Sequence, residues 1–304
     1  MDGSRCPVKD GGMTSIAVPV LFCLFIWWFS TGVILYLDGL PQRTFRWSLL
    51  IATALAALAL YGVAVSAADD SARGAYLAFT SALVLWGWHE MSFLMGVVTG
   101  PRRSVCPPNA IGWQRLRYAV ETIAYHELAI AGTAALVAVM TSDANNKIGL
   151  WTFLVLWSMR ISAKLNVFLG VPNLSEDWLP NQLSFLKSYF RKAPMNLFFP
   201  VAVTAATIAT VMLAQLALAP MVTPAQSTGL MLLAVLMGLA VLEHWILVLP
   251  FPFAALWAWG LDSHRRGEAA KSEANEVPLQ TKTKYTAGLS ANRAITKRTV
   301  HSVP

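Results

Sequence analysis

The sequence predicts an all-α, polytopic integral membrane bundle of about seven transmembrane helices, and three observations support this fold class. Hydrophobic residues make up 56% of the 304 residues, only 13% are charged, and the mean hydropathy is +0.53. Soluble globular domains carry roughly 25% charged residues, because they need a solvated surface. The apolar residues also lie in blocks of about 20, the length that crosses the hydrocarbon core of a bilayer. This composition excludes an ordinary soluble domain.

Seven apolar blocks define the predicted spans. They cover residues 14–37, 47–68, 75–98, 116–140, 148–170, 197–219 and 229–249, within a transmembrane domain of residues 14–260. The seventh helix should end or kink at Pro250 and Pro252, because two prolines remove two backbone donors. Residues 1–13 precede the first span. Residues 261–304 lack apolar periodicity, and we expect them to form a disordered basic tail.

The distribution of Lys and Arg predicts the orientation of these spans. If the N-terminus lies outside, the cytoplasmic loops and tail hold 17 Lys and Arg, and the outer segments hold four. Such a bias fits the positive-inside rule, which places the C-terminus in the cytoplasm. The net charge of +7 therefore arises from loops and tail. It indicates contact with anionic lipid at the cytoplasmic face and gives no support for nucleic-acid binding.

Residues 180–190 carry an amphipathic pattern outside the spans. The basic residues Lys187, Arg191 and Lys192 accompany apolar residues at helical spacing, namely Leu179, Leu183, Leu186 and Phe190. The pattern predicts a helix lying on the cytoplasmic leaflet, with its apolar face in lipid and its cations at the headgroups. The alternative is a segment that packs against the bundle.

The loop between the third and fourth spans is stiff and basic, with Arg102, Arg103 and Cys106 among prolines. The plain interpretation is a cytoplasmic turn that stops translocation, and the sharper alternative is a docking loop for a partner or a lipid headgroup. The three cysteines, Cys6, Cys23 and Cys106, are odd in number and widely spaced. This spacing indicates neither a disulfide framework nor a structural zinc site.

Ionisable residues inside four of the spans are the main functional signal. A rise of about 1.5 Å per residue places the three intramembrane histidines and Arg160 at a similar depth. A charge at the bilayer centre costs about 2.5–3.5 kcal/mol on insertion scales, so such residues should face each other or a wet cavity. The candidate site consists of His89, Glu90, Glu121, His126, Glu127, Arg160, Lys164, Glu243 and His244.

Three interpretations of this layer stay open. It can be a buried ion-pair network that fixes helix register. It can bind a tetrapyrrole, a metal or a quinone, with a neutral imidazole as axial ligand and the carboxylates behind it. It can conduct protons or ions. A zincin motif is absent, because Phe93 and Ile130 stand where HExxH needs its second histidine. The residues therefore identify no metal and no catalytic group.

Several long motifs resemble one family of membrane proteins. They are WGWHE at 86–90, GPRR at 100–103, CPP at 106–108, YHEL at 125–128, RISAKLN at 160–166, GVPN at 170–173, SYF at 188–190 and PMN at 194–196. In these stretches the chain resembles the photosynthetic complex assembly proteins called PuhE, which purple phototrophic bacteria encode near the reaction-centre H subunit. The resemblance covers about residues 14–260.

The resemblance implies a multi-pass protein of the bacterial inner membrane, with a periplasmic N-terminus. It implies a non-catalytic accessory factor for assembly of the reaction centre and the core light-harvesting complex, whose subunits would be its partners, and a role in bacteriochlorophyll supply. The family supplies no catalytic residues to carry over. Two alternatives remain: a pigment-handling protein in which His89, His126 or His244 holds the magnesium of bacteriochlorophyll or a precursor, and a transporter or membrane oxidoreductase.

Overall fold

The structure is a computed structural model that describes residues 11–174, 179–250, 253–263 and 266. These residues form helices and no strand, so the all-α prediction is confirmed for the described part of the chain. The α helices are α1 (Gly11–Asp38), α2 (Gln42–Ala67), α3 (Ala72–Leu94), α4 (Gly112–Met140), α5 (Ile148–Leu169), α6 (Phe198–Ala217) and α7 (Pro224–Ile246). Two 3-10 helices, η2 (Asn181–Tyr189) and η3 (Phe253–Trp257), follow α5 and α7.

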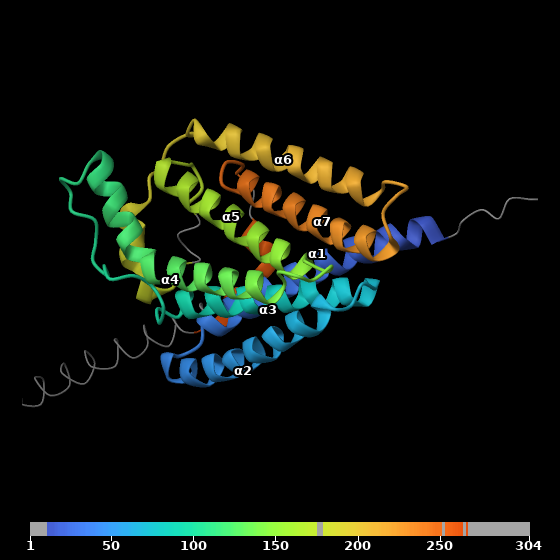
Figure 1. The fold of residues 1–304 in the computed structure, drawn as a ribbon. Helices are drawn as coiled ribbons and strands as arrows, with labels where there is room; N and C mark the ends of the chain where they lie inside the picture. Colours follow the sequence, from blue (N-terminus) through green and yellow to red (C-terminus); the bar gives the residue numbers. More distant parts are fainter. Residues whose placement is uncertain (1–10, 175–178, 251–252, 264–265, 267–304) are drawn as a thin grey trace, which may run out of the picture.

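The helices form an elongated bundle in which α3 is central. Figure 1 shows the α2–α3 pair on one side of α5 and the α6–α7 pair on the other, and α3 contacts α1, α2, α4, α5 and α7. The outer faces of α2 and α6 carry exposed apolar side chains such as Leu55, Leu58 and Val211. Exposed apolar surface of this kind suits contact with lipid.

Six of the described helices are long and apolar enough to cross a membrane, and α3 is not among them. The other six, α1, α2, α4, α5, α6 and α7, indicate a multi-pass membrane protein. The α3 helix has 23 residues, and many of its side chains are buried, including Ser81, His89, Glu90 and Ser92. A helix that is covered by neighbours can carry polar residues that a lipid-facing helix cannot, which lowers its hydropathy.

Polar caps fix several helix ends. Ser71 accepts a hydrogen bond from the Gly74 N–H at the start of α3. At the start of α7, Thr223 and Gln226 form a reciprocal capping box with Pro224 at the first helical position. The α5 helix ends at Gly170, whose φ of 126° lies in the left-handed region that favours glycine. These caps set where the membrane helices begin and end.

The loop after α3 inserts its backbone against the first half of α4. The Thr99 carbonyl accepts from the His126 N–H at 2.8 Å, and the Arg102 N–H donates to the Glu121 carbonyl at 3.3 Å. Gly100 lies so close that a Cβ there would collide with the backbone of Glu121 and Thr122. Figure 1 shows that α4 bends part-way along its length. Because a group inserted beside a helix ladder is a known cause of kinks, we attribute the bend to this loop.

The segment predicted as an amphipathic α-helix on the membrane surface differs from that expectation. It forms the 3-10 helix η2, and its leucines Leu183 and Leu186 are buried against Phe93 of α3, with Ile123 of α4 beside them. Arg115 of α4 donates to the carbonyls of Phe168 and Tyr189, which ties the end of α5 to η2. The apolar face therefore meets protein, as the alternative interpretation stated, and the expectation that it faces lipid is wrong.

The chain after α7 returns to α1. Leu261 and Trp257 are buried against Leu35, and the Trp257 indole donates to the Trp28 carbonyl at 2.9 Å. Residues 258–263 are helical, so they do not belong to a disordered tail. Residues 1–10 and 267–304, which hold most of both predicted terminal segments, lie outside the described residues.

Candidate functional site

The carboxylate of Glu90 on α3 and the guanidinium of Arg160 on α5 form the first ion pair of the layer. Glu90 Oε2 lies 2.5 Å from Arg160 Nη2. The Glu90 side chain is only 8% exposed, whereas the Arg160 side chain is 41% exposed. The buried carboxylate is thus neutralised from one side, and the cation remains partly open to the surroundings of α5.

A second ion pair joins α4 to α5 one turn further along. Lys164 Nζ lies 2.7 Å from Glu127 Oε1, and the Trp157 indole donates to Glu127 Oε2 at 2.9 Å. Lys164 also lies over the ring of Phe93, 5.5 Å from its centroid. Both oxygens of the Glu127 carboxylate are therefore held by one face of α5.

The α7 helix contributes a third carboxylate and a histidine. The indole of Trp27 on α1 donates to Glu243 Oε1 at 2.8 Å. His244 Nδ1 lies 2.8 Å from the Ala240 carbonyl, and its Nε2 lies 2.9 Å from the Ser162 hydroxyl on α5. Since a carbonyl only accepts, the neutral imidazole carries its proton on Nδ1 and accepts from Ser162.

His89 and His126 lie side by side between α3 and α4. His89 Nε2 lies 2.9 Å from the Thr133 hydroxyl, and the two imidazole centroids are 6.4 Å apart. The His126 ring packs on Phe93 at a centroid distance of 4.5 Å. The layer thus spans α1, α3, α4, α5 and α7, and it brings together eight of the nine predicted residues: His89, Glu90, His126, Glu127, Arg160, Lys164, Glu243 and His244.

Glu121 does not join the layer. Its carboxylate pairs with Arg117, at 2.9 Å, and with Arg102 of the preceding loop, at 3.7 Å. Arg102 also donates to the Tyr189 hydroxyl at 2.8 Å, and this hydrogen bond raises the pKa of the Arg102 guanidinium. Glu121 therefore anchors the loop to α4, at the end of α4 away from the paired carboxylates.

The predicted docking loop is largely tied to the rest of the protein. The Cys106 N–H donates to the Ser188 hydroxyl at 2.8 Å, and Tyr189 donates to the Ser104 carbonyl. Of the three residues singled out in this loop, only Arg103 is exposed. Arg102 and Cys106 thus connect the loop to η2.

Sequence reasoning missed several polar partners of the layer. Trp27 lies in a span whose sequence indicates a packing helix. Its position near mid-helix could have indicated a polar partner, because tryptophan is enriched at the membrane interface. Trp157 precedes Arg160 and Lys164 by three and seven residues, so all three share one helix face. Thr133, which contacts His89, follows His126 by seven residues, so Thr133 and His126 share one face of α4.

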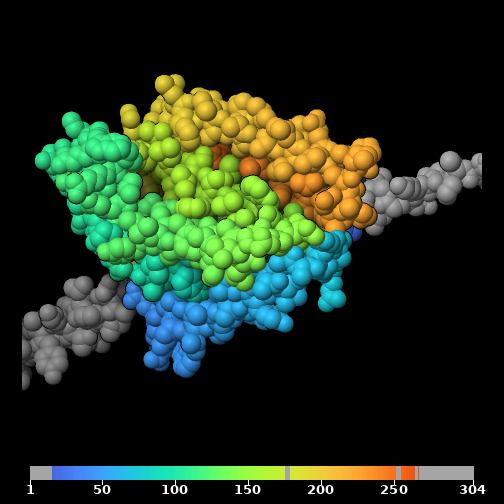
Figure 2. Space-filling view, in the orientation of Figure 1, coloured from blue at the N-terminus to red at the C-terminus, as the bar shows by residue number. Residues whose placement is uncertain are grey.

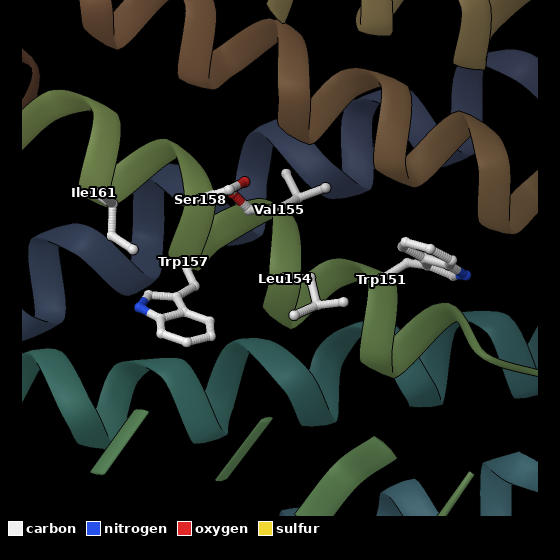
Figure 3. A pocket seen from close by; sticks show the side chains of 6 residues that line it. All are labelled: Trp151, Leu154, Val155, Trp157, Ser158 and Ile161. Atoms are coloured by element: carbon white, nitrogen blue, oxygen red, sulfur yellow. The ribbon is translucent and has the colours of Figure 1, made fainter. Parts of the chain in front are cut away.

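A shallow groove runs along the exposed face of α5. Figure 2 shows this side of the molecule hollowed beside α5, between α4 and the α6–α7 pair. Figure 3 shows the side chains that line the groove, which has a volume of about 310 Å³. They are Trp151, Leu154, Val155, Trp157, Ser158 and Ile161, and all belong to α5. Because Trp157 holds Glu127, the groove borders the second ion pair.

The arrangement suits charge pairing more than the capture of a metal ion. Among the described residues, no three His, Cys, Asp or Glu side chains are placed to hold one ion. Both cations of the layer contact a carboxylate, and both ring nitrogens of His244 have protein partners. Of the three histidines that the structure describes, only His126 has no hydrogen-bond partner at either ring nitrogen.

Comparison with known proteins places the chain in a family. Residues 13–268 match the family described as "Protein of unknown function (DUF3623)". A relative from Rhodobacter capsulatus, described as an uncharacterized 30.4 kDa protein in the puhA 5′ region, is 42% identical over 262 residues, covering 85% of this chain and 94% of the relative. No solved structure matches. The chain therefore belongs to the DUF3623 family.

Proposed function

We propose that this protein is a non-catalytic accessory factor of the bacterial inner membrane that assists assembly of the photosynthetic reaction centre and the core light-harvesting complex. The observation that carries the proposal is the relative at 42% identity, whose description places it in the puhA 5′ region. The motifs that resemble PuhE support the same function. The proposed role also includes the supply of bacteriochlorophyll to the assembling complexes.

The proposed topology has seven spans, with the N-terminus in the periplasm and the C-terminus in the cytoplasm. A helix of 23 residues such as α3 is about 35 Å long, enough to cross the hydrocarbon core. Its neighbours shield its polar residues from lipid, so low hydropathy does not prevent it from spanning. The excess of Lys and Arg on one side of the bundle supports the orientation.

The paired layer supports a scaffolding role. It joins α5 to α3 through Glu90 and to α4 through Glu127, with opposite charges at short distance. Ion pairs of this kind favour one helix arrangement over shifted ones, because a slip of one residue would leave charges unpaired in the membrane. A rigid bundle with a defined surface suits a protein that receives the helices of another.

We propose that the groove on α5 receives a transmembrane helix of a reaction-centre or core antenna subunit. The groove follows a single helix for about three turns, so its shape is elongated along the membrane normal, as a helix requires. Arg160, next to the groove residue Ile161, is far more exposed than its partner Glu90. Part of the guanidinium is therefore open to a partner. The proposed occupant carries a hydrogen-bond acceptor at mid-membrane depth, which covers this cation.

The test is complementation of a Rhodobacter capsulatus strain that lacks the 42% identical relative. We expect this chain to restore the reaction-centre and core antenna absorption of isolated membranes during phototrophic induction. A strain that assembles both complexes at the parental rate without the relative would overturn the proposal. Lack of rescue by a well-expressed, membrane-inserted chain would also count against it.

The groove is tested with a matched pair of variants. Ser158→Trp fills the groove, whereas Ile208→Trp introduces the same side chain at an exposed position of α6. We expect Ser158→Trp to lose rescue and Ile208→Trp to keep it, at equal protein level. Equal rescue by both variants would exclude the groove as the contact surface and leave the assembly role standing.

A further inference from the structure

His126 is a fully buried histidine whose side chain has no protein hydrogen bond. Its relative exposure is 0%, and within the described residues neither Nδ1 nor Nε2 has a hydrogen-bond partner. The ring packs on Phe93, and its own backbone N–H donates to the Thr99 carbonyl. The residue is therefore fixed in position while both of its side-chain nitrogens are left unsatisfied.

Three neighbouring side chains share this property. His89 Nδ1, Glu90 Oε1 and Thr99 Oγ1 are buried and also lack a partner within the described residues. They come from α3 and from the loop that inserts against α4, and the His89 ring lies 6.4 Å from the His126 ring, centroid to centroid. Unsatisfied polar atoms thus gather on both sides of the α3–α4 contact, beside the Glu90–Arg160 pair.

Such a concentration is costly unless a ligand satisfies it. A buried polar group left without a partner loses its hydrogen bonds to water and gains none in return, and this region holds several such groups. The neutral imidazole of His126 needs one acceptor and one donor, the Glu90 oxygen needs a donor, and the Thr99 hydroxyl can use either. Only a molecule that both donates and accepts hydrogen bonds can serve all of these atoms.

The surroundings narrow the choice to a very small molecule. His126 is fully buried and packed by Phe93 and the Thr99 loop, so a flat macrocycle could reach its ring nitrogens only if these groups moved. An anion would be repelled by Glu90. A metal ion is disfavoured because no three ligating side chains of the described residues face one point. Water is the smallest molecule with the required donors and acceptors.

We propose that water molecules bind inside the membrane domain, between α3 and α4, and connect His126 to Glu90 and His89. The two ring nitrogens of His126 point in divergent directions, so one water cannot serve both, and the site holds a small cluster. The polar layer is then partly hydrated, and its unpaired atoms are satisfied by bound water. This inference does not depend on the proposed role in assembly.

The experiment compares His126 with His244 in the same protein. Both are buried, at 0% and 1% exposure, but the ring nitrogens of His244 are bonded to Ala240 and Ser162. The full chain carries ¹⁵N-labelled histidine in lipid bilayers, with His264 and His301 replaced by Gln so that three histidines remain. Water-edited solid-state NMR then measures magnetisation transfer from water protons to each imidazole.

We expect transfer to the His126 ring to be several-fold stronger than transfer to the His244 ring, with His89 showing transfer at Nδ1. His126→Phe should remove the strong signal and weaken the one from His89. If that variant does not fold, sequential backbone assignment of a uniformly ¹³C- and ¹⁵N-labelled chain identifies the same resonances without the substitution. Equally weak transfer to His126 and His244 would overturn the proposal. A ¹⁵N shift of His126 that reports direct bonding to a metal or a pigment would overturn it as well.

Discussion

The side-chain amide of Asn196 joins the end of α5 to the start of α6 by contacting Asn166. Its Nδ2 donates to the side-chain and backbone oxygens of Asn166, at 3.0 and 3.2 Å, and to the Gly170 carbonyl at 2.9 Å. Its Oδ1 accepts from the N–H groups of Phe198 and Phe199. One amide therefore caps two membrane helices, and Asn166 itself is fully buried.

Replacing this amide should destabilise the fold. Asn196→Ala removes the cap of α6 and takes a donor away from the Gly170 carbonyl and from Asn166 Oδ1, so we expect a loss of about 2–4 kcal/mol. Asn196→Asp keeps the acceptor for α6 and loses the donors to α5, so its loss should be intermediate. Denaturant unfolding in bicelles, followed by tryptophan fluorescence, measures both. Equal stability of Asn196→Ala and the parent chain would contradict the capping role.

The Glu90–Arg160 pair should couple strongly. Arg160→Met leaves a buried carboxylate without its cation, and Glu90→Gln leaves the cation without its anion, so each should cost about 3–5 kcal/mol. The double variant removes both charges and should be milder than the sum of the two single changes. The readout is the folded yield and unfolding free energy of all four proteins. Additive losses, or unaltered stability in both single variants, would refute a structural ion pair.

The indole of Trp157 should stabilise the fold through its hydrogen bond to Glu127. Trp157→Phe keeps a large aromatic ring and removes a bond to a charged group, so we expect a loss of about 1–3 kcal/mol. Trp151→Phe is the matched control, because Trp151 lines the same groove and is 54% exposed. That change should have little effect on unfolding. Losses of similar size in the two variants would assign the effect to aromatic bulk and not to the hydrogen bond.

Two glycines near or within α4 should respond oppositely to alanine. Gly100→Ala drives a Cβ into the backbone of Glu121 and Thr122, and overpacking of this kind costs about 1–3 kcal/mol. Gly132 lies within α4, and a Cβ there would meet nothing within 4 Å. Because glycine disfavours helix, Gly132→Ala should stabilise by about 0.5–1 kcal/mol. Thermal unfolding of both variants checks the signs, and a neutral Gly100→Ala would show that the loop can move away from α4.

Much of the helical architecture could be predicted from the sequence, because hydropathy responds directly to the lengths of apolar blocks. The predicted spans and the observed helices differ by no more than five residues at any end. Their packing could not be predicted, since helix adjacency is a property of side-chain fit that a hydropathy profile does not contain. The low hydropathy of α3 makes sense only once its covering neighbours are known.

The candidate layer was foreseeable in its members and not in its pairings. Depth along each helix grouped the three histidines with Arg160, because rise per residue is fixed. It did not identify which carboxylate pairs with Arg160 or Lys164. The hydrogen bond from Trp27 to Glu243 was not predicted, because tryptophan is largely apolar and its single N–H gives no sign in the sequence of a polar partner. The 180–190 segment was misjudged, since spacing that fits an amphipathic helix is the same whether protein or lipid covers the apolar face.

The backbone contacts between α4 and the loop after α3, such as that of His126 with Thr99, fix how far α4 is rotated about its axis. An α-helix turns by about 100° per residue. Loss of one residue of α4 between Glu121, whose carbonyl accepts from the Arg102 N–H, and Glu127 would therefore rotate Glu127 away from Lys164. Length changes in this short region should be far less tolerated than substitutions. The rotation of α4 about its axis is thus specified partly from outside the helix, by backbone contacts of the loop that precedes it.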